Sequence, residues 1–251
     1  YRRLTAYWLA ARCARNASAI VSIAGDYVPR VLADLLSQKP IHYIANPISH
    51  SFFTLRTPST SSASGPVILW VGAIREGKNL VDLVRAFRLV VDQRPDAFLR
   101  LIGGIYEPEY YRRVQREIMQ LGLADKVMQS GAVQLSELEL AYAEATMVVM
   151  CSLQETAPMT LAQAMAAGKP VIGTRVGGIP WMVEDGVSGF LVDTGDVELL
   201  KVRMLELLDD EARARAMGEV ARQRAKMLFA PAMVASRTVS VYRGLVVGGR
   251  E

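Results

Sequence analysis

Short apolar runs alternate along the chain with longer segments in which apolar residues recur at helical spacing. Buried parallel strands give short, nearly continuous apolar runs, whereas amphipathic helices give a period of about 3.6 residues. The pattern predicts strands at residues 19–23, 41–45, 67–71, 98–102, 127–129, 147–151, 171–174 and 190–192. It predicts helices at residues 80–91, 109–121, 136–144, 160–167 and 197–208. Strands that alternate with helices in this way indicate an α/β fold with a Rossmann-like, doubly wound parallel sheet.

The chain divides into four predicted parts. Residues 54–66, "TLRTPSTSSASGP", are rich in Ser, Thr and Pro and lack apolar periodicity, which is typical of a linker. Residues 67–230 contain enough predicted strands and helices for a complete doubly wound domain. Residues 1–53 provide only two strands, too few for a core of their own, so we expect the tail end of a larger upstream domain. Residues 231–251 are predicted to form a last helix or tail that crosses back to that domain.

Composition narrows the class of protein. The chain is 51% hydrophobic and 22% charged, as expected of a globular protein rather than a disordered one. No apolar run reaches the roughly 18 residues of a membrane span, and no leader pattern is present, so we predict a cytoplasmic location. Cys13 and Cys151 are too few for a disulfide framework or a metal site.

The net charge of +4 is mild and does not indicate a nucleic-acid partner. Basic residues at 85–100 and 112–116 fall at helical spacing, which favours solvated helix faces. Peripheral contact with the acidic inner surface of a membrane, or an anionic ligand, is the alternative for these stretches.

The loops that follow the predicted strands are the first place to look for a site, because ligands of open parallel sheets bind at the carboxyl ends of the strands. In "VGAIREGKN", residues 71–79, Gly72 allows close backbone approach, and Arg75 and Lys78 come just before a helix that would itself attract an anion. An ordinary surface turn fits this loop equally well. No G-x-G-x-x-G or G-x-x-x-x-G-K-[ST] pattern is present, which argues against dinucleotide and P-loop sites.

Two further strand ends carry glycine. "RLIGG" at residues 100–104 ends one strand, and "QSGAV" at residues 129–133, with Gly131 and Val133, ends the next. Each is also consistent with a simple tight turn. Because three such loops would meet at one edge of the sheet, together they favour a ligand site there.

A helix is predicted to open after Pro158 in "QETAPMTLAQAMAAG". The first backbone N–H groups of a helix have no partner within it, so those of Met159, Thr160 and Leu161 are expected to point toward the same edge. A helix start of this kind favours phosphate or another anion.

Two polar side chains flank that helix start. Glu155 would repel a phosphate and is better suited to accept hydrogen bonds from sugar hydroxyls. Gln163 lies one helical turn beyond Met159, where its amide could pair with the vicinal hydroxyls of a ribose. A helix-capping role for Glu155 and a plain surface position for Gln163 remain the alternatives.

The segment from Glu155 to Gln163, with seven residues between them, resembles the E-x7-E segment of family 4 retaining glycosyltransferases, which have the two-domain GT-B fold. "ILWVGAIREGKNLVDLVRAF" and "LRLIGG" resemble the first two strands and the basic loop of that family's C-terminal domain. "SAIVSIAGDYVPRVLAD" and "IHYIANPI" resemble the end of its N-terminal, acceptor-side domain. The resemblance covers residues 18 to 230.

The resemblance implies a nucleoside-diphosphate sugar as substrate, most simply a UDP- or GDP-sugar, and no metal or other cofactor. By position, Lys78 would hold the diphosphate and Glu155 the donor sugar, which makes these two the expected catalytic residues. Gly72, Arg75, Met159, Thr160 and Leu161 would surround the phosphates, Gln163 would bind the ribose, and the loop from Gly131 to Val133 would meet the base. Expected partners are a saccharide or lipid-linked acceptor and an N-terminal domain in cis.

The chain departs from the family pattern at three positions. Ala73 stands where the family usually has Arg, Gln163 replaces the second Glu, and Trp181 replaces the Glu that usually follows "GGIP". We expect this chain alone to be inactive in transfer. A non-catalytic nucleotide-sugar-binding subunit, or a degenerate relative with a protein partner, is the alternative function, and a related epimerase or phosphorylase is the third. The sugar, the base and the acceptor cannot be read from the sequence.

Overall fold

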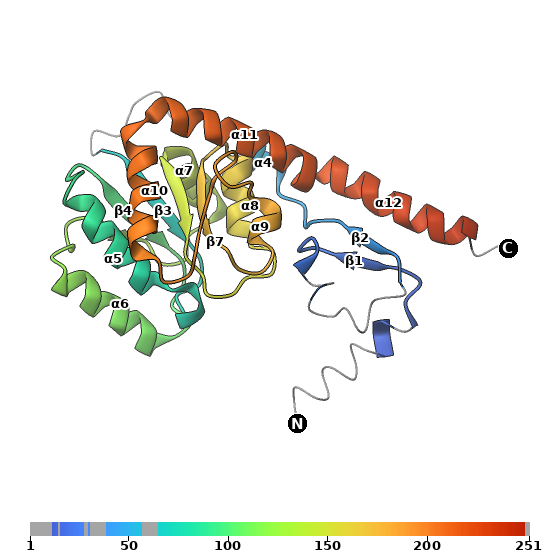
Figure 1. Cartoon of the computed structure of the whole chain (residues 1–251), viewed down its shortest axis with the longest axis horizontal. Coiled ribbons are helices and arrows are strands. Elements are labelled where there is room, and N and C mark those ends of the chain that lie inside the picture. Colours follow the sequence, from blue (N-terminus) through green and yellow to red (C-terminus); the bar gives the residue numbers. More distant parts are fainter. Residues whose placement is uncertain (1–11, 15, 28–29, 31–38, 57–64, 249–251) are drawn as a thin grey trace.

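The computed structural model describes residues 12–14, 16–27, 30, 39–56 and 65–248 (Figure 1). All eight predicted strands are present within these residues, and their ends agree with the predictions to within two residues. The strands are β1 Ile20–Ser22, β2 Ile41–Tyr43, β3 Val67–Val71, β4 Phe98–Ile102, β5 Val127–Gln129, β6 Met147–Met150, β7 Val171–Thr174 and β8 Phe190–Val192. The predicted linker at 54–66 falls largely outside the described residues.

The strands form two parallel sheets. β1 and β2 pair with each other, while the other six follow the order β5-β4-β3-β6-β7-β8. The chain therefore builds outward from β3 to β5, returns to the other side of β3 with β6, and builds outward again to β8. Strand order reverses between β3 and β6, whose residues Ile68 and Leu69 pair with Met147 and Val148. This parallel, doubly wound sheet confirms the predicted fold class.

The helices cover both faces of the six-stranded sheet (Figure 1). They are α4 His50–Phe53, η1 Glu76–Lys78, α5 Leu80–Val91, α6 Pro108–Gln120, α7 Leu135–Glu144, α8 Met159–Ala166, α9 Ile179–Met182, α10 Val197–Asp209, α11 Glu211–Phe229 and α12 Pro231–Gly248. The five helices predicted between the strands are present, each shifted by no more than one residue.

Two separate apolar clusters hold the helices on the sheet. Successive side chains of a strand point to opposite faces, so Ile68 and Trp70 of β3 join one cluster with residues of α5, α6 and α10. Leu69 joins the other, with residues of α7, α8 and α11. All three of these β3 side chains are fully buried. A central strand buried on both faces explains why the sequence of β3, Val-Ile-Leu-Trp-Val, shows no alternation.

Helix α11 was not predicted from the apolar pattern, and its composition explains why. Its buried face consists mainly of small residues, including Ala214, Gly218, Ala221 and Ala225, separated by Arg and Glu. Gly218 lies against the backbone of Gly168 with no room for a Cβ. The helix therefore packs closely on the end of α8 through small side chains. Its two large buried apolar residues, Met217 and Phe229, lie too far apart to mark a helical stripe in the sequence.

The two-stranded sheet is joined to the rest of the chain by specific contacts. The N–H group of Ile48 donates to the carbonyl oxygen of Phe229 at 2.9 Å. The indole of Trp181 in α9 lies against Gly25, which has a φ of 55° and no space for a side chain. Figure 1 shows α12 leaving the six-stranded sheet toward the side on which β1 and β2 lie. Within the described part of the chain, no helix has the combined length and apolar character needed to cross a membrane.

Candidate functional site

The reversal of strand order brings together two loops that are far apart in sequence. Residues 72–79 follow β3, and residues 151–158 follow its neighbour β6. The loops are joined directly, because the N–H group of Leu153 donates to the carbonyl oxygen of Gly77 at 2.9 Å. In doubly wound sheets the crevice at this point is the usual ligand site. The predicted residues Lys78 and Glu155 come one from each loop.

Lys78 and Glu155 form an ion pair through Nζ and Oε1. Their side chains are 14% and 10% exposed, so the pair is largely removed from bulk water, where the attraction between opposite charges is stronger. The hydroxyl of Ser152 donates to the same Oε1 at 2.7 Å. Among the described residues, no group donates to Oε2 of Glu155. One carboxylate oxygen is therefore fixed by the protein and the other is available to a ligand.

Ser152 is itself held in place from the neighbouring strand. It is fully buried, and its carbonyl oxygen accepts a hydrogen bond of 2.6 Å from the hydroxyl of Thr174, at the end of β7. On the other side, the thiol of Cys151 donates to the carbonyl oxygen of Asn79 at 3.3 Å. Burial raises the pKa of Cys151 to about 12, so the thiol stays neutral and acts as a structural donor.

Two glycines support the loop that carries Glu155. Gly177 and Gly178 follow β7, and a Cβ at either position would overlap the carbonyl oxygen of Glu155 or Thr156. Gly177 also has a φ of 54°, a conformation that side chains disfavour. The glycine pair therefore allows the two backbones to lie in contact, which fixes the height of Glu155 above the sheet.

A polar cavity of about 630 Å³ opens beside the ion pair. It lies between the loops after β3 and β6, and its lining is Arg75, Glu76, Gly77, Glu107, Leu153, Gln154, Glu155 and Thr156. The guanidinium of Arg75 lies over Gly77. No ion-pair or hydrogen-bond partner for this guanidinium is found among the described residues, so its charge is available to an anion in this cavity.

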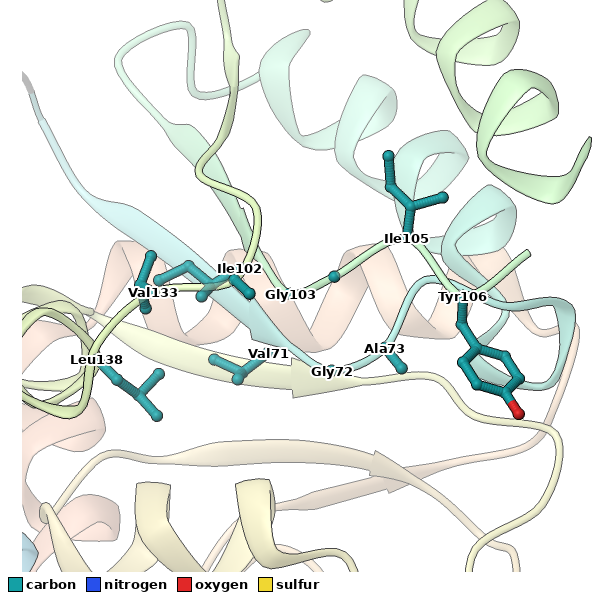
Figure 2. Close-up of a pocket in the computed structure, with 11 residues that line it drawn as sticks. Val71, Gly72, Ala73, Ile102, Gly103, Ile105, Tyr106, Val133 and Leu138 are labelled. Carbon is teal, nitrogen blue, oxygen red and sulfur yellow. The ribbon is translucent and has the colours of Figure 1, made fainter. Parts of the chain in front are cut away.

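A second, mainly apolar cavity of about 380 Å³ lies between the ends of β3 and β4 and the loop after β5 (Figure 2). Its lining consists of glycine and apolar or aromatic residues, namely Val71, Gly72, Ala73, Ile102, Gly103, Gly104, Ile105, Tyr106, Ala132, Val133 and Leu138. The predicted residues Gly72 and Val133 both line it. Gly131 does not, but its carbonyl oxygen accepts from the N–H group of Gly103 at 2.7 Å and so ties the loop to β4.

The loops after β3 and β4 are bonded to each other where the two cavities approach. The N–H group of Ile74 donates to Gly104, and the carbonyl oxygen of Ile74 accepts from Tyr106 and Glu107 at 3.1 and 3.0 Å. Tyr106 lines the apolar cavity, while the next residue, Glu107, lines the polar one. Main-chain hydrogen bonds thus extend the sheet beyond its strands and form a partition between the cavities.

The start of α8 has the predicted form. Pro158 is the N-cap residue and offers no capping side chain. The N–H group of Leu161 already donates to the carbonyl oxygen of Pro158 at 3.2 Å. Partners for the N–H groups of Met159 and Thr160 are not found among the described residues. These two amides, rather than three, are available to a ligand in this structure.

Gln163 is connected to the core of the domain. Its Oε1 atom lies 3.1 Å from the hydroxyl of Tyr142, which also lies 3.1 Å from the carbonyl oxygen of Thr160. Tyr142 is fully buried and makes an edge-to-face contact with Phe52. Burial raises the pKa of this phenol, so it remains a hydrogen-bond donor.

Several residues of the site were not predicted. Ser152 and Tyr142 act through hydrogen bonds to Glu155 and Gln163, and their only sequence signal is a polar group at the end of an apolar strand or helix. Tyr106 and Glu107 line the cavities, and a polar or aromatic residue shortly after the glycine pair of a strand end could have indicated them. No cluster of His, Cys, Asp and Glu that could hold a metal ion is found in the described part of the chain.

Comparison with known proteins identifies the family. The model of the group 1 glycosyl transferases matches residues 52–224. N-acetyl-alpha-D-glucosaminyl L-malate synthase from Bacillus anthracis is 33% identical over 181 residues, which are 72% of this chain and 46% of that protein. D-inositol 3-phosphate glycosyltransferase from Corynebacterium glutamicum is 31% identical, over 72% of this chain and 44% of its own length. The chain thus spans somewhat less than half of these relatives.

Solved structures agree with the fold. Sucrose-phosphate synthase from Thermosynechococcus elongatus superposes with a TM-score of 0.82 at 25% identity, covering 96% of this chain and 61% of that one. HepE from Anabaena, solved in complex with UDP and glucose, has a TM-score of 0.77 at 20% identity, over 94% and 65% of the two chains. These structural neighbours are GT-B glycosyltransferases. On the family match and the fold together, the chain belongs to the group 1 glycosyl transferases.

Proposed function

We propose that this chain is the donor-binding half of a glycosyltransferase that moves a hexosyl group from a nucleoside-diphosphate sugar to an acceptor hydroxyl with retention of configuration. The observation that carries the proposal is the position of Lys78 and Glu155, paired at the point where strand order reverses, beside an uncapped helix start. One site therefore contains a cationic group that suits phosphates and a carboxylate that suits sugar hydroxyls, and a nucleoside-diphosphate sugar requires both.

The diphosphate of this substrate binds at the cationic end of the polar cavity. Lys78 and Arg75 provide charge, and the N–H groups of Met159 and Thr160 provide hydrogen bonds at the positive end of α8. These groups also stabilise the negative charge that develops on the diphosphate as the sugar leaves, because fixed donors that face developing charge lower the barrier. In this mechanism, side chains and a helix start neutralise the charge of the leaving group.

The sugar and the nucleoside use the remaining groups. Oε2 of Glu155, which the protein leaves free, accepts hydrogen bonds from the donor sugar. Gln163 contacts the ribose, and the apolar cavity at Val133 takes the base of UDP or GDP against glycine backbone and apolar side chains. The acceptor, a saccharide or lipid-linked alcohol, approaches from outside the described part of the chain. A phosphate oxygen of the departing diphosphate takes the proton of the acceptor hydroxyl, on the face from which the diphosphate left.

The proposal is tested by calorimetric titration of the chain with UDP, GDP and ADP and with their glucose and mannose conjugates. We expect one diphosphate to bind in the micromolar to millimolar range and its conjugate to bind more tightly. Circular dichroism and a cooperative thermal transition establish that the chain is folded. If a folded chain binds none of the nucleotides, the donor-binding proposal is wrong.

A further inference from the structure

Lys78 is the cation best placed beside Glu155, yet its charge is already used within the protein. Its Nζ atom is paired with Oε1 of Glu155, and both side chains are mostly buried. Arg75, in contrast, lines the neighbouring polar cavity, and its guanidinium has no ion-pair or hydrogen-bond partner among the described residues. The site therefore contains one cation whose charge is free, Arg75, and one that is neutralised by a carboxylate from the facing loop.

We propose that Glu155 competes with the ligand's diphosphate for Lys78, so that diphosphate binding releases Glu155 to recognise the sugar. This inference rests on the proposed function, since it concerns the same site and the same ligand. Arg75 and the start of α8 attract the diphosphate first. Lys78 then moves its hydrogen bond from the carboxylate to a phosphate oxygen, and the carboxylate gains an unpaired Oε1 lone pair for a sugar hydroxyl.

Exchange is favoured over simultaneous binding by the charges involved. A diphosphate beside Glu155 adds negative charge to a site from which water is largely excluded, where like charges repel strongly. The ammonium of Lys78 is a compact donor on a flexible stem, so it can turn between two acceptors at small cost. The transfer replaces one charge-assisted hydrogen bond by another. Part of the affinity that Lys78 would give to the diphosphate is thus lost in breaking the internal pair.

Ser152 keeps the carboxylate of Glu155 in place during the exchange. Its hydroxyl donates to Oε1 of Glu155, and its carbonyl oxygen is bonded to Thr174 in the next strand. When Lys78 turns away, this second donor keeps the carboxylate in position above the sheet. Sugar recognition is therefore coupled to the diphosphate, because a free sugar, which cannot remove Lys78 from Oε1 of Glu155, can use only the Oε2 atom.

The test is the effect of Glu155→Gln on UDP and on UDP-sugar, using the full chain and whichever base binds. The substitution keeps the shape of the side chain and removes its charge, so Lys78 is released in the empty protein. We expect UDP to bind about three- to tenfold more tightly, the size of effect that a partly buried ion pair produces. The additional affinity contributed by the sugar is expected to fall by a similar factor. An unchanged or weaker affinity for UDP would overturn the proposal.

A double-mutant cycle separates competition from simple repulsion. If Glu155 acts by holding Lys78, Glu155→Gln will tighten UDP binding less in a Lys78→Ala background than in the unmodified chain. If it acts only by repelling phosphate through space, the gain will be at least as large there, and the proposal is wrong. Ligand-observed phosphorus NMR measures the weak binding expected of the Lys78→Ala proteins.

Asp193→Asn is the matched control for charge. Asp193 follows β8 at the same edge of the sheet but pairs with Arg175 at 3.6 Å instead of Lys78. Its neutralisation should leave the affinity for UDP unchanged, and an equal gain from both substitutions would contradict competition for Lys78. Failure of every protein to bind any nucleotide contradicts the proposed function instead, so the two failures are distinguishable.

Discussion

The two cavities at the carboxyl edge of the sheet are built in different ways. The apolar cavity lies against the ends of β3 and β4 and is lined by glycine backbone and apolar or aromatic side chains. The polar cavity lies between loops from both sides of the strand-order reversal and contains Arg75, Glu107 and Glu155. The first can select a ligand by shape and thickness, and the second by charge and hydrogen bonding. Under the proposed function, one substrate spans both.

Displacing the loop that carries Glu155 should cause the largest loss of stability. It should distort the polar cavity and leave the apolar one intact. Gly177→Ala forces a Cβ against the carbonyl oxygen of Glu155 and strains a positive φ. We expect a loss of about 2–4 kcal/mol in the free energy of unfolding, the sum of backbone strain and overpacking. Urea denaturation measures it.

The matched control for that substitution is Gly186→Ala. Gly186 has a φ of 78°, but no neighbouring atom would contact its Cβ. This variant should lose only the cost of the backbone conformation, about 1–2 kcal/mol. Equal losses in the two variants would show that contact with the Glu155 loop contributes nothing.

Removing the cation that is paired with Glu155 beside the polar cavity is expected to have the next largest effect. Lys78→Ala should weaken the binding of the nucleoside diphosphate by about 10- to 100-fold, because a charge-assisted hydrogen bond contributes about 1.5–3 kcal/mol. Pyrophosphate alone should be affected as strongly. Calorimetry measures both. Lys201→Ala in α10 is the control, since within the described part of the chain that lysine pairs only with Glu198 on its own helix. Similar losses in the two variants would contradict the assignment of Lys78.

Substitutions in the apolar cavity should affect binding of the base rather than binding of the phosphates. Val133→Ala removes two carbons that face the cavity, and we expect the nucleoside diphosphate to bind about 4- to 15-fold more weakly, at roughly 0.8 kcal/mol for each of these carbons that the base would bury. Pyrophosphate, which has no base, should bind as it does to the unmodified chain. A parallel loss for pyrophosphate would mean that the two cavities do not act separately.

The smallest effect is expected at Tyr142, which reaches the ligand only through Gln163. Tyr142→Phe keeps the buried ring and its contact with Phe52 but removes the hydroxyl next to Gln163. We expect about two- to fivefold weaker binding of the nucleoside diphosphate, the lower part of the range for a neutral hydrogen bond. A 2′,3′-dideoxyribose analogue should bind both proteins equally. A loss that is the same for both ligands would point to a general structural effect.

Much of the fold could be predicted because buried strands have a recognisable apolar pattern in the sequence. The buried strands β3 and β6 consist of uninterrupted apolar residues, and the glycines that follow β3, β4 and β5 locate the edge where loops gather. The pairing of Lys78 with Glu155 could be anticipated only as proximity, because both follow neighbouring strands. The formation of an ion pair between Lys78 and Glu155 depends on the conformation of two loops, which the residue types do not specify.

Other features could not be predicted because they depend on contacts that are distant in sequence. Trp181 was a departure from the family pattern without an explanation. In the structure it lies against Gly25, some distance away in the chain, where it connects α9 to the segment that carries β1. Ser152 is marked in the sequence only as a polar residue after an apolar strand, because its position depends on a hydrogen bond from the hydroxyl of Thr174 at the end of β7.

The partition between the two cavities has a consequence for redesign. Its hydrogen bonds run from the main chain of Ile74 to the main chain of Gly104, Tyr106 and Glu107, and no side chain takes part in them. Side chains that face either cavity, such as those of Ala73 on one side and Gln154 on the other, can therefore be exchanged without removing the wall between them. Glu107 should be kept, because its carboxylate accepts a hydrogen bond of 2.8 Å from the N–H group of Glu76. Libraries of variants that change the specificity for the base and libraries that change the specificity for the sugar can be built and screened independently on this scaffold. Their successful substitutions can then be combined.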